Sequence, residues 1–174
     1  MEAVDTLEVI ASGPLTTVQD RGRSGYGRYG VPPSGALDSF SHRVANLVVG
    51  NPETEACLEI TLMGLRVKAL NEVAVAVTGA NLQPYHDEKP LDMWTSCILE
   101  KGSLLSLRAV KGGCRSYLAI GGGISLPEVM GSKSTNLCSK FGGLEGRSLR
   151  KGDILSSISP QLHLKTQGLS LIHI

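Results

Sequence analysis

Two groups of polar residues, far apart in the chain, have types and spacing that suit binding of a small polar molecule. The first is the run Gln19-Asp20-Arg21 together with Arg23, which places a carboxylate beside two guanidinium groups. A neighbouring arginine favours the charged form of a carboxylate. This group therefore suits either the positioning of a substrate or an internal pairing that fixes the loop, and the residues alone leave both roles open.

The second group is Ser132-Lys133-Ser134-Thr135, in which three hydroxyls flank an ammonium group. Hydroxyls and backbone N–H groups in such a turn suit an anion, although an ordinary polar turn explains the spacing equally well. The run is not a phosphate-binding loop, because Ser132 stands where a glycine must precede the lysine. The nearby "GGGISLPEVMG" lacks the dinucleotide fingerprint, because Leu126 occupies the position of its third glycine.

The cysteines and histidines predict no metal site. No two cysteines have the CxxC spacing, and the histidines do not cluster near them. We expect reduced thiols that serve as small packing residues. The cysteines are Cys57, Cys97, Cys114 and Cys138. We expect His42, on the polar side of a helix, and His86, in a charged turn, to be solvated.

Glycine-rich segments surround both polar groups. Thr17–Asp38 holds five glycines and two prolines, and Gly112–Gly152 holds ten of the 21 glycines in the chain. Glycine allows positive φ angles and close approach of the backbone to a neighbour. Long ordered loops on a rigid scaffold usually carry function, so we expect the two segments to form facing walls of one site.

Short strands must hold these loops in place. Val73–Thr78 is a continuous apolar run, typical of a strand buried on both faces. Met93–Leu99 and Leu104–Val110 are expected to pair as a hairpin through the turn Glu100–Ser103. Further strands are expected at Leu7–Ser12, Leu15–Val18, Leu58–Leu62, Val67–Ala69, Ser116–Ile120 and Ile154–Ile158.

One segment has a clear helical pattern. Asp38 or Ser39 can cap its start, Gly50 fits the position after its end, and Asn51-Pro52 stops it. The apolar residues at helical spacing are Leu37, Phe40, Val44, Leu47 and Val48. One helix among seven or more short strands predicts a mainly-β barrel or sandwich.

Composition narrows the class of protein further. The chain has 174 residues with a net charge of +1, which does not favour nucleic-acid or membrane-surface binding. It has no apolar run near the roughly 20 residues that a membrane-spanning helix requires. The start "MEAVDTLEV" is acidic and lacks a signal-peptide pattern, so a cytoplasmic location is expected.

Taken together, five segments resemble the biotin-dependent carboxyltransferase family. They are "GPLTTVQDRGRSGYGRYGVPPSGALD", "RVANLVVGNPETEACLEITLMG", "VAVTGA", "RSYLAIGGGISLPEVMGSKST" and "FGGLEGRSLRKGD". The family includes the C subunit of bacterial ATP-dependent 5-oxoprolinase, the sporulation regulator KipA and the carboxyltransferase domain of urea carboxylase. The resemblance runs from about Leu7 to Ile158.

The resemblance implies a cyclophilin-like β barrel and a longer protein. Members of the family are roughly twice as long, with a second β half packed on the first. Residues 1–158 would then be the N-terminal half of a carboxyltransferase-type domain, and residues 159–174 a truncated or non-native tail. Such a half is expected to be inactive without its C-terminal half.

The resemblance also implies three possible functions. The favoured one is a subunit of ATP-dependent 5-oxoprolinase, which works with separate A and B subunits to open 5-oxoproline, a small amide, to glutamate. ATP would be consumed by the complex. One alternative is carboxyl transfer from biotin to urea or a similar amide, and the other is a non-catalytic regulatory protein like KipA. The chain lacks a biotin carboxylase segment and an Ala-Met-Lys-Met motif, which favours the first.

Site roles follow from the same resemblance. Asp20 is expected to orient the substrate or accept its proton, and Arg23 to bind a carboxylate or phosphate. Lys133 stands where relatives often have arginine, so it keeps the charge without the planar fork. The remaining residues expected to bind substrate are Gln19, Tyr26, Ser34, Gly35, Asp38, Ser132, Lys133, Ser134, Thr135, Gly142, Gly143 and Arg147.

Overall fold

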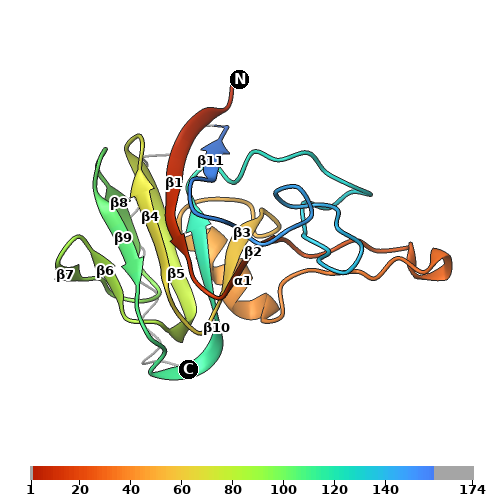
Figure 1. Cartoon of the computed structure of the whole chain (residues 1–174), viewed down its shortest axis with the longest axis horizontal. Coiled ribbons are helices and arrows are strands. Elements are labelled where there is room, and N and C mark those ends of the chain that lie inside the picture. Colours follow the sequence, from red (N-terminus) through yellow and green to blue (C-terminus); the bar gives the residue numbers. More distant parts are fainter. Residues whose placement is uncertain (1, 159–174) are drawn as a thin grey trace.

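The protein is a two-sheet β structure with one helix packed on its side (Figure 1). The computed structural model describes residues 2–158, so the expectation for the 159–174 tail lies outside the described residues. The α-helix is α1 (Ser39–Val48), and a short 3₁₀ helix, η1, spans Gly27–Tyr29. The strands are β1 (Val4–Ser12), β2 (Leu15–Gln19), β3 (Cys57–Thr61), β4 (Leu65–Ala69), β5 (Val73–Asn81), β6 (Pro84–His86), β7 (Lys89–Pro90), β8 (Ser96–Leu99), β9 (Leu104–Leu107), β10 (Gly112–Ile120) and β11 (Ile154–Ser157).

The strands divide into two antiparallel sheets. The first has the order β11-β1-β4-β9-β6-β7, and the second has the order β2-β3-β10-β5-β8. The prediction of a mainly-β fold with one clear helix and long glycine-rich loops is confirmed. Over residues 2–158 the strand pairing does not close into a single barrel, so the arrangement is nearer the sandwich that the strand pattern also allowed.

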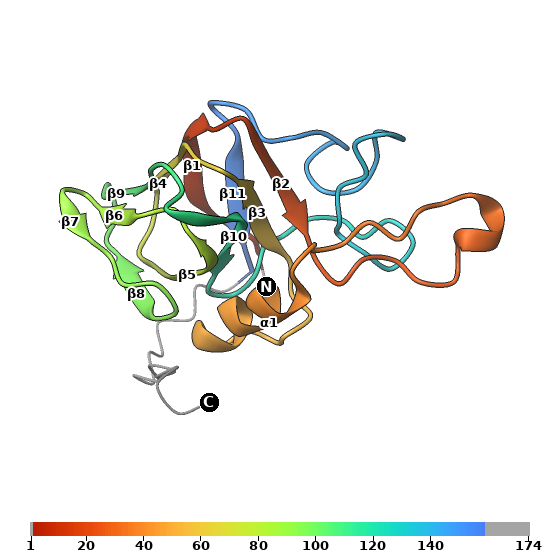
Figure 2. The ribbon, with the colours of Figure 1, turned by 90° about the horizontal axis from the view of Figure 1, so that it is seen from below.

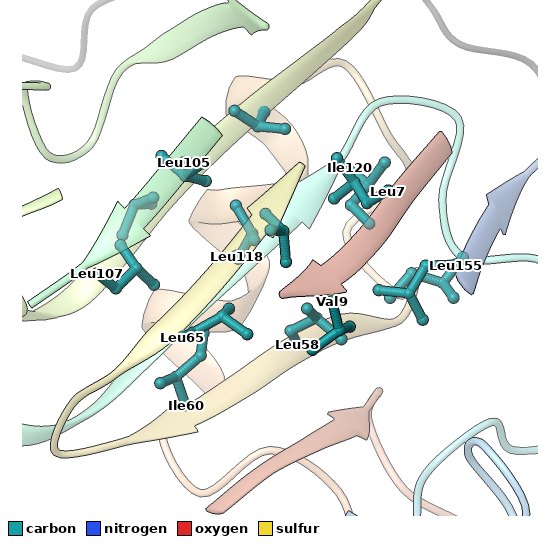
Figure 3. Close-up of a cluster of buried hydrophobic side chains, with 14 of the residues drawn as sticks. Leu7, Val9, Leu58, Ile60, Leu65, Leu105, Leu107, Leu118, Ile120 and Leu155 are labelled. Atoms are coloured by element: carbon teal, nitrogen blue, oxygen red, sulfur yellow. The ribbon is translucent and has the colours of Figure 1, made fainter. Parts of the chain in front are cut away.

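The main hydrophobic core lies between the two sheets (Figure 3). Leu7 and Val9 of β1 meet Leu58 of β3 and Leu118 of β10, and all four side chains are fully buried. Burying a side chain of this size contributes about 1.5–3 kcal/mol relative to leaving it in water. This core fixes the strand ends from which the long loops leave.

Strand β5 is buried on both faces, as its apolar run predicts. Val75 and Val77 belong to the core between the sheets, whereas Ala76 faces the opposite way and packs in the cluster around α1. Alternate residues of a strand point to opposite sides of the sheet, so both sides of β5 require small apolar residues. The second sheet is therefore the middle layer of three, between the first sheet and α1.

Both predicted ends of α1 are confirmed. The Asp38 carboxylate caps the helix by accepting hydrogen bonds from the backbone N of Ser41 at 3.0 Å and from its Oγ at 2.6 Å. Gly50 follows the last turn with φ of 80°, the left-handed conformation that glycine adopts without steric cost.

The apolar pattern of α1 predicted its buried face only in part. Val44 and Val48 pack against the second sheet with Tyr117, as expected from their spacing. Phe40 and Leu47 are more than half exposed. The helix contacts the sheet along a narrower stripe than the sequence suggested, and Phe40 instead packs near Trp94 with ring centroids 6.2 Å apart.

The expected hairpin between β8 and β9 is wrong. Strand β8 pairs with β5 in the second sheet, whereas β9 pairs with β4 and β6 in the first. The turn Glu100–Ser103 therefore carries the chain from one sheet to the other. Its Gly102 N–H bonds to the Ala69 carbonyl at 2.7 Å, which anchors the crossing to β4.

Two long loops leave the same end of the sandwich. The first long loop (residues 20–38) connects β2 to α1, and the second long loop (residues 121–153) connects β10 to β11. Figure 2 shows the first long loop projecting far from the sheets, with η1 at its tip and the second long loop beside its base. Within residues 2–158, no helix has the length and apolar character needed to cross a membrane.

Candidate functional site at the junction of the two long loops

Asp20 joins the two long loops at their bases. Its Oδ1 accepts hydrogen bonds from Ser132 Oγ at 2.7 Å, Ser134 Oγ at 2.5 Å and the backbone N of Gly22 at 2.7 Å. Its Oδ2 accepts from the backbone N of Lys133 at 2.6 Å. The predicted closeness of Asp20 to the serine-rich segment is thus confirmed, and four donors converge on a carboxylate that is almost completely buried.

These contacts set the protonation state of Asp20. Burial alone raises the pKa of a carboxyl group, but here the hydrogen bonds from Ser134, Ser132, Gly22 and Lys133 outweigh it and lower the pKa below its ordinary value. Asp20 is therefore a carboxylate at neutral pH with its acceptor sites occupied. This geometry suits an orienting role better than the proton-accepting role.

Arg23 crosses the same junction from the first loop. It is 2% exposed and donates from Nη2 to the Ser134 carbonyl at 2.6 Å and from Nη1 to Ser34 Oγ at 3.0 Å. Its Nε donates to the Val129 carbonyl at 3.3 Å, and the guanidinium lies 4.7 Å from the ring centre of Phe141. Burial lowers the pKa of Arg23 while the charge of Asp20 opposes the shift, and an arginine in this setting keeps its charge.

Gln19 adds a third connection between the loops. Its Nε2 donates to the Thr135 carbonyl at 3.2 Å, and its Oε1 accepts from the backbone N of Gly35 at 3.0 Å. Thr135 in turn donates from its backbone N to the Val18 carbonyl at 2.9 Å. The predicted walls therefore meet in a hydrogen-bonded junction, and at this point no open space separates them.

Close packing at the junction explains two of the predicted glycines. Gly142 has φ of 69°, and a Cβ atom there would collide with the Ser134 carbonyl and lie 2.9 Å from Arg23 Nη2. Any larger residue would push apart the two segments that hold Arg23. The expectation that Gly142 allows close approach is confirmed, and the same holds for Gly143 against Thr135.

Two of the predicted cationic residues already have partners within the chain. Lys133 Nζ pairs with Glu55 Oε1 at 2.6 Å. Arg147 forms a bidentate salt bridge with Asp153, with N–O distances of 2.7 Å and 3.0 Å. This salt bridge raises the pKa of Arg147. Both side chains fix the second loop, and substrate binding by either remains a prediction.

The other predicted residues of the first loop are spread along it. Ser34 and Gly35 lie at the junction through their bonds with Arg23 and Gln19. Asp38 caps α1. Tyr26 precedes η1 at the tip of the projecting loop, so the structure does not bring it to the junction (Figure 2).

His42 is a residue that the sequence interpretation missed. It was expected in solvent, but it is 1% exposed and packs edge-on against Tyr117 with ring centres 6.1 Å apart. Burial lowers its pKa, although nearby carbonyls and the charges of Asp20 and Glu59 partly oppose the shift, so the ring is neutral at neutral pH. The helical spacing could have predicted this burial, because Ala45 and Val49, three and seven residues after His42, lie on the same buried face of the helix.

A cleft of about 180 Å³ lies beside the junction, between the base of the first loop and α1. Its lining residues are Asp20, Arg21, Ala36, Ser39, His42 and Arg43. A larger hollow of about 480 Å³ opens on the far part of the second loop, where it is bordered mainly by apolar and glycine residues such as Leu126, Phe141 and Leu144. The smaller cleft is lined by Asp20 itself, whereas the larger hollow borders on Arg23 through Val129 and Phe141.

The cysteines are free thiols, as predicted, but only some of them are packed in the interior. All four are free thiols. Cys57 is buried in β3, and burial raises the pKa of its thiol, but Cys114 and Cys138 are exposed. Among residues 2–158, histidine, cysteine and carboxylate side chains form no group suited to a metal ion.

Comparison with known proteins identifies the family. A family model described as carboxyltransferase domain, subdomain A and B, matches residues 29–170. The chain belongs to this carboxyltransferase-domain family. The resemblance found in the sequence is thereby confirmed.

Relatives within the carboxyltransferase-domain family are named either as 5-oxoprolinase C subunits or as urea-processing enzymes. The C subunit of 5-oxoprolinase from Escherichia coli K12 is 45% identical over 151 residues, which cover 86% of this chain and 48% of the relative. The urea amidolyase of Lachancea kluyveri is 41% identical over 157 residues, covering 90% of this chain and 9% of that protein. The crystal structure of K. lactis urea amidolyase superposes with a TM-score of 0.87 at 40% identity, covering 98% of this chain and 10% of that one.

The chain spans about half the length of its relatives among the 5-oxoprolinase C subunits, 48% of the E. coli protein and 54% of the one from Haemophilus influenzae. The activity of a whole carboxyltransferase-domain protein is therefore only proposed for this chain. What its own residues provide is a rigid junction of buried charges with a small cleft beside it.

Proposed function

We propose that this chain forms the N-terminal half of an amide-opening subunit that works with separate A and B subunits, as in ATP-dependent 5-oxoprolinase. In that reaction the lactam C–N bond of 5-oxoproline opens by addition of water to give glutamate, and the complex converts ATP to ADP and phosphate. The cytoplasm is the compartment that this proposal assumes. ATP acts as a reactant of the assembled complex.

The observation that carries this proposal is the 45% identity with the C subunit of E. coli 5-oxoprolinase over 86% of the chain. That relative is a protein about twice as long as the matched segment, whereas the urea amidolyase match covers 9% of a much longer protein. The junction supports the proposal chemically. A rigid set of buried charges beside a cleft of about 180 Å³ suits a molecule of the size of a small amide.

A segment exchange tests the proposal. The matched segment of the E. coli C subunit is replaced by this chain, and the chimera is combined with the E. coli A and B subunits. We expect ATP-dependent release of glutamate from 5-oxoproline, measured by coupled glutamate detection. Reactions without ATP, or without the A and B subunits, serve as controls and should release none.

A chimera that folds, assembles with its two partners, and still releases no glutamate would contradict the proposal. Folding and assembly are checked by circular dichroism and size-exclusion chromatography, so that a misfolded protein is recognised as such. The unaltered E. coli protein gives the reference rate.

The second candidate is carboxyl transfer from biotin to urea. It is favoured by the 41% identity with L. kluyveri urea amidolyase and by the superposition on the K. lactis enzyme. Biotin would be carried by another segment or protein. Exchange of this chain into the corresponding segment of urea amidolyase separates the two candidates, because only this one predicts ATP- and bicarbonate-dependent consumption of urea.

A further inference from the structure

A thiol and an imidazole meet between the two sheets, at the end of the sandwich away from the two long loops (Figure 2). Cys97 of β8 pairs with Val75, and His86 of β6 pairs with Leu105. Val75 and Leu105 both belong to the core between the sheets, and paired residues of neighbouring strands point to the same side of their sheet. Cys97 and His86 therefore face each other from opposite sheets, with Sγ 3.7 Å from Nδ1.

The thiol hydrogen of Cys97 has two acceptors in reach. One is the carbonyl of Ile98 at 3.4 Å, and the other is Nδ1 of His86 at 3.7 Å. Only the imidazole can take up the proton and leave a thiolate. Burial raises the pKa of Cys97, so this thiol needs such a base in order to react at neutral pH.

The other ring nitrogen of His86 faces a carboxylate. Its Nε2 lies 3.7 Å from Oδ2 of Asp87, close enough for attraction once the ring is protonated. Oδ1 of Asp87 accepts a hydrogen bond from the backbone N of Leu104 at 2.8 Å, which holds the carboxylate in place. The imidazole thus lies between a thiol and a carboxylate, an arrangement in which a base can take the proton of a nucleophile.

The surroundings of His86 also favour the protonated ring. A cavity of about 370 Å³ opens beside it, lined by His86, Asp87, Glu88, Lys89, Glu100 and Ser103. Three carboxylates and one ammonium group leave a net negative charge there, which stabilises an imidazolium. The side chain of His86 is 27% exposed, so it is more enclosed than the sequence suggested, and Cys97 is also partly exposed. A small molecule can therefore reach the pair.

We propose that Cys97 is a site of oxidation by a small peroxide, with His86 as the base. Nδ1 of His86 takes the thiol proton, and the sulfur attacks one oxygen of hydrogen peroxide. The O–O bond breaks, and the leaving hydroxide takes the proton from His86 to become water. The sulfur is oxidised to a sulfenic acid as the peroxide is reduced. This site is separate from the junction and from the proposed amide-opening function.

Labelling of the complete 174-residue chain tests the proposal. The reduced chain is treated with hydrogen peroxide in the presence of dimedone, which traps sulfenic acids, and each cysteine peptide is quantified by mass spectrometry. Cys114 and Cys138 are the reference cysteines, because both are more exposed than Cys97. We expect Cys97 to be labelled at least about tenfold faster than either, because a positioned base accelerates proton transfer by such factors or more.

Two variants assign the roles. His86→Gln should slow the labelling of Cys97 about tenfold and leave the reference cysteines unchanged, because glutamine cannot take the proton. Asp87→Asn keeps an oxygen for the backbone N of Leu104 but removes the charge, and it should slow labelling about threefold. Asp87 is 57% exposed, so its replacement leaves the fold intact even if His86→Gln does not fold. Asp92→Asn is the matched control, an exposed carboxylate outside the cavity, and it should have no effect.

The pH dependence separates a base from a residue that only packs against the thiol. In His86→Gln the labelling rate should still rise above about pH 9, because the thiol must ionise unaided and burial raises its pKa. In the unaltered chain the rate should level off at lower pH. The proposal is overturned if Cys97 is labelled no faster than the reference cysteines, or if His86→Gln keeps the rate and pH profile of the unaltered chain.

Discussion

At the scale of single residues, Asp20 connects segments more than a hundred positions apart in the chain. Its four hydrogen-bond donors come from both long loops, and its side chain is almost completely buried. In asparagine one of the two oxygens becomes an NH₂ group. Even with the amide oxygen kept at the Oδ1 position, the backbone N of Lys133 faces this NH₂ group without an acceptor, and the other three donors bond to a neutral oxygen instead of a charged one. The stability of the junction therefore depends on the negative charge of this residue.

We predict that Asp20→Asn lowers the free energy of unfolding by about 3 kcal/mol, because buried donors lose their charged acceptor. The measurement is chemical denaturation followed by circular dichroism. Asp92→Asn is the control, since Asp92 is exposed, and it should change stability by less than about 0.5 kcal/mol. Equal effects of the two substitutions would show that the junction does not depend on the charge.

The pH dependence of stability gives a second residue-scale prediction. The folded pKa of Asp20 is lowered, so its ionised form stabilises the folded state fully above the unfolded pKa of about 3.9. That contribution is lost as the pH falls through the lower folded pKa. The stability difference between the unaltered chain and Asp20→Asn should therefore stay constant above about pH 5 and shrink toward about pH 2. A difference that does not vary with pH would contradict this assignment.

His42 shows where reasoning from single residues failed. The sequence placed His42 on the polar side of the helix and therefore predicted a solvated side chain, yet its spacing from Ala45 and Val49 places it on the buried side of α1. By contrast, the meeting of Asp20 with Ser132–Ser134 was predicted correctly. That prediction used two long polar loops and a family resemblance, whereas the place of His42 depends on how α1 is rotated on the sheet.

At the scale of elements, short sequence motifs predicted the ends of the helix correctly, whereas the sequence did not predict correctly which strands pair. The start of α1 at Asp38 and its end before Gly50 are both correct, because a cap and a left-handed glycine act within one helical turn. The pairing of β8 with β9 was wrong, because an apolar strand can add to either sheet with the same alternation. Which sheet a strand joins depends on contacts with strands distant in sequence.

The second long loop offers a test of close packing at this scale. Gly131 and Gly142 have nearly the same positive φ, 71° and 69°, but only Gly142 is crowded, by the Ser134 carbonyl and Arg23. Gly131→Ala should cost about 1 kcal/mol for the left-handed backbone alone. Gly142→Ala should cost about 3 kcal/mol, because overpacking adds to the same backbone strain. Thermal unfolding of both variants measures the difference, and equal losses would mean that the loops are not held by close contact.

At the scale of the whole molecule, the second sheet is shared by two packing clusters. Leu118 of β10 lies in the core between the sheets, while its neighbours Tyr117 and Ala119 face α1. The two clusters are therefore linked through one strand, and α1 cannot separate from the sheet without exposing β10. This arrangement holds the cleft, the junction and the sandwich in one cooperative unit.

Leu118→Ala should consequently destabilise both layers together, by about 2–5 kcal/mol, because it leaves a cavity at the centre of the shared sheet. The single tryptophan, Trp94, packs against the α1 cluster and reports on that layer by fluorescence, whereas far-ultraviolet circular dichroism reports on the strands. The two transitions should coincide in the unaltered chain and in the variant. Leu137→Ala, at a position 43% exposed in the second loop, should leave both nearly unchanged. If the Trp94 transition came at a lower denaturant concentration than the dichroism transition, α1 and the cleft would unfold as a separate unit.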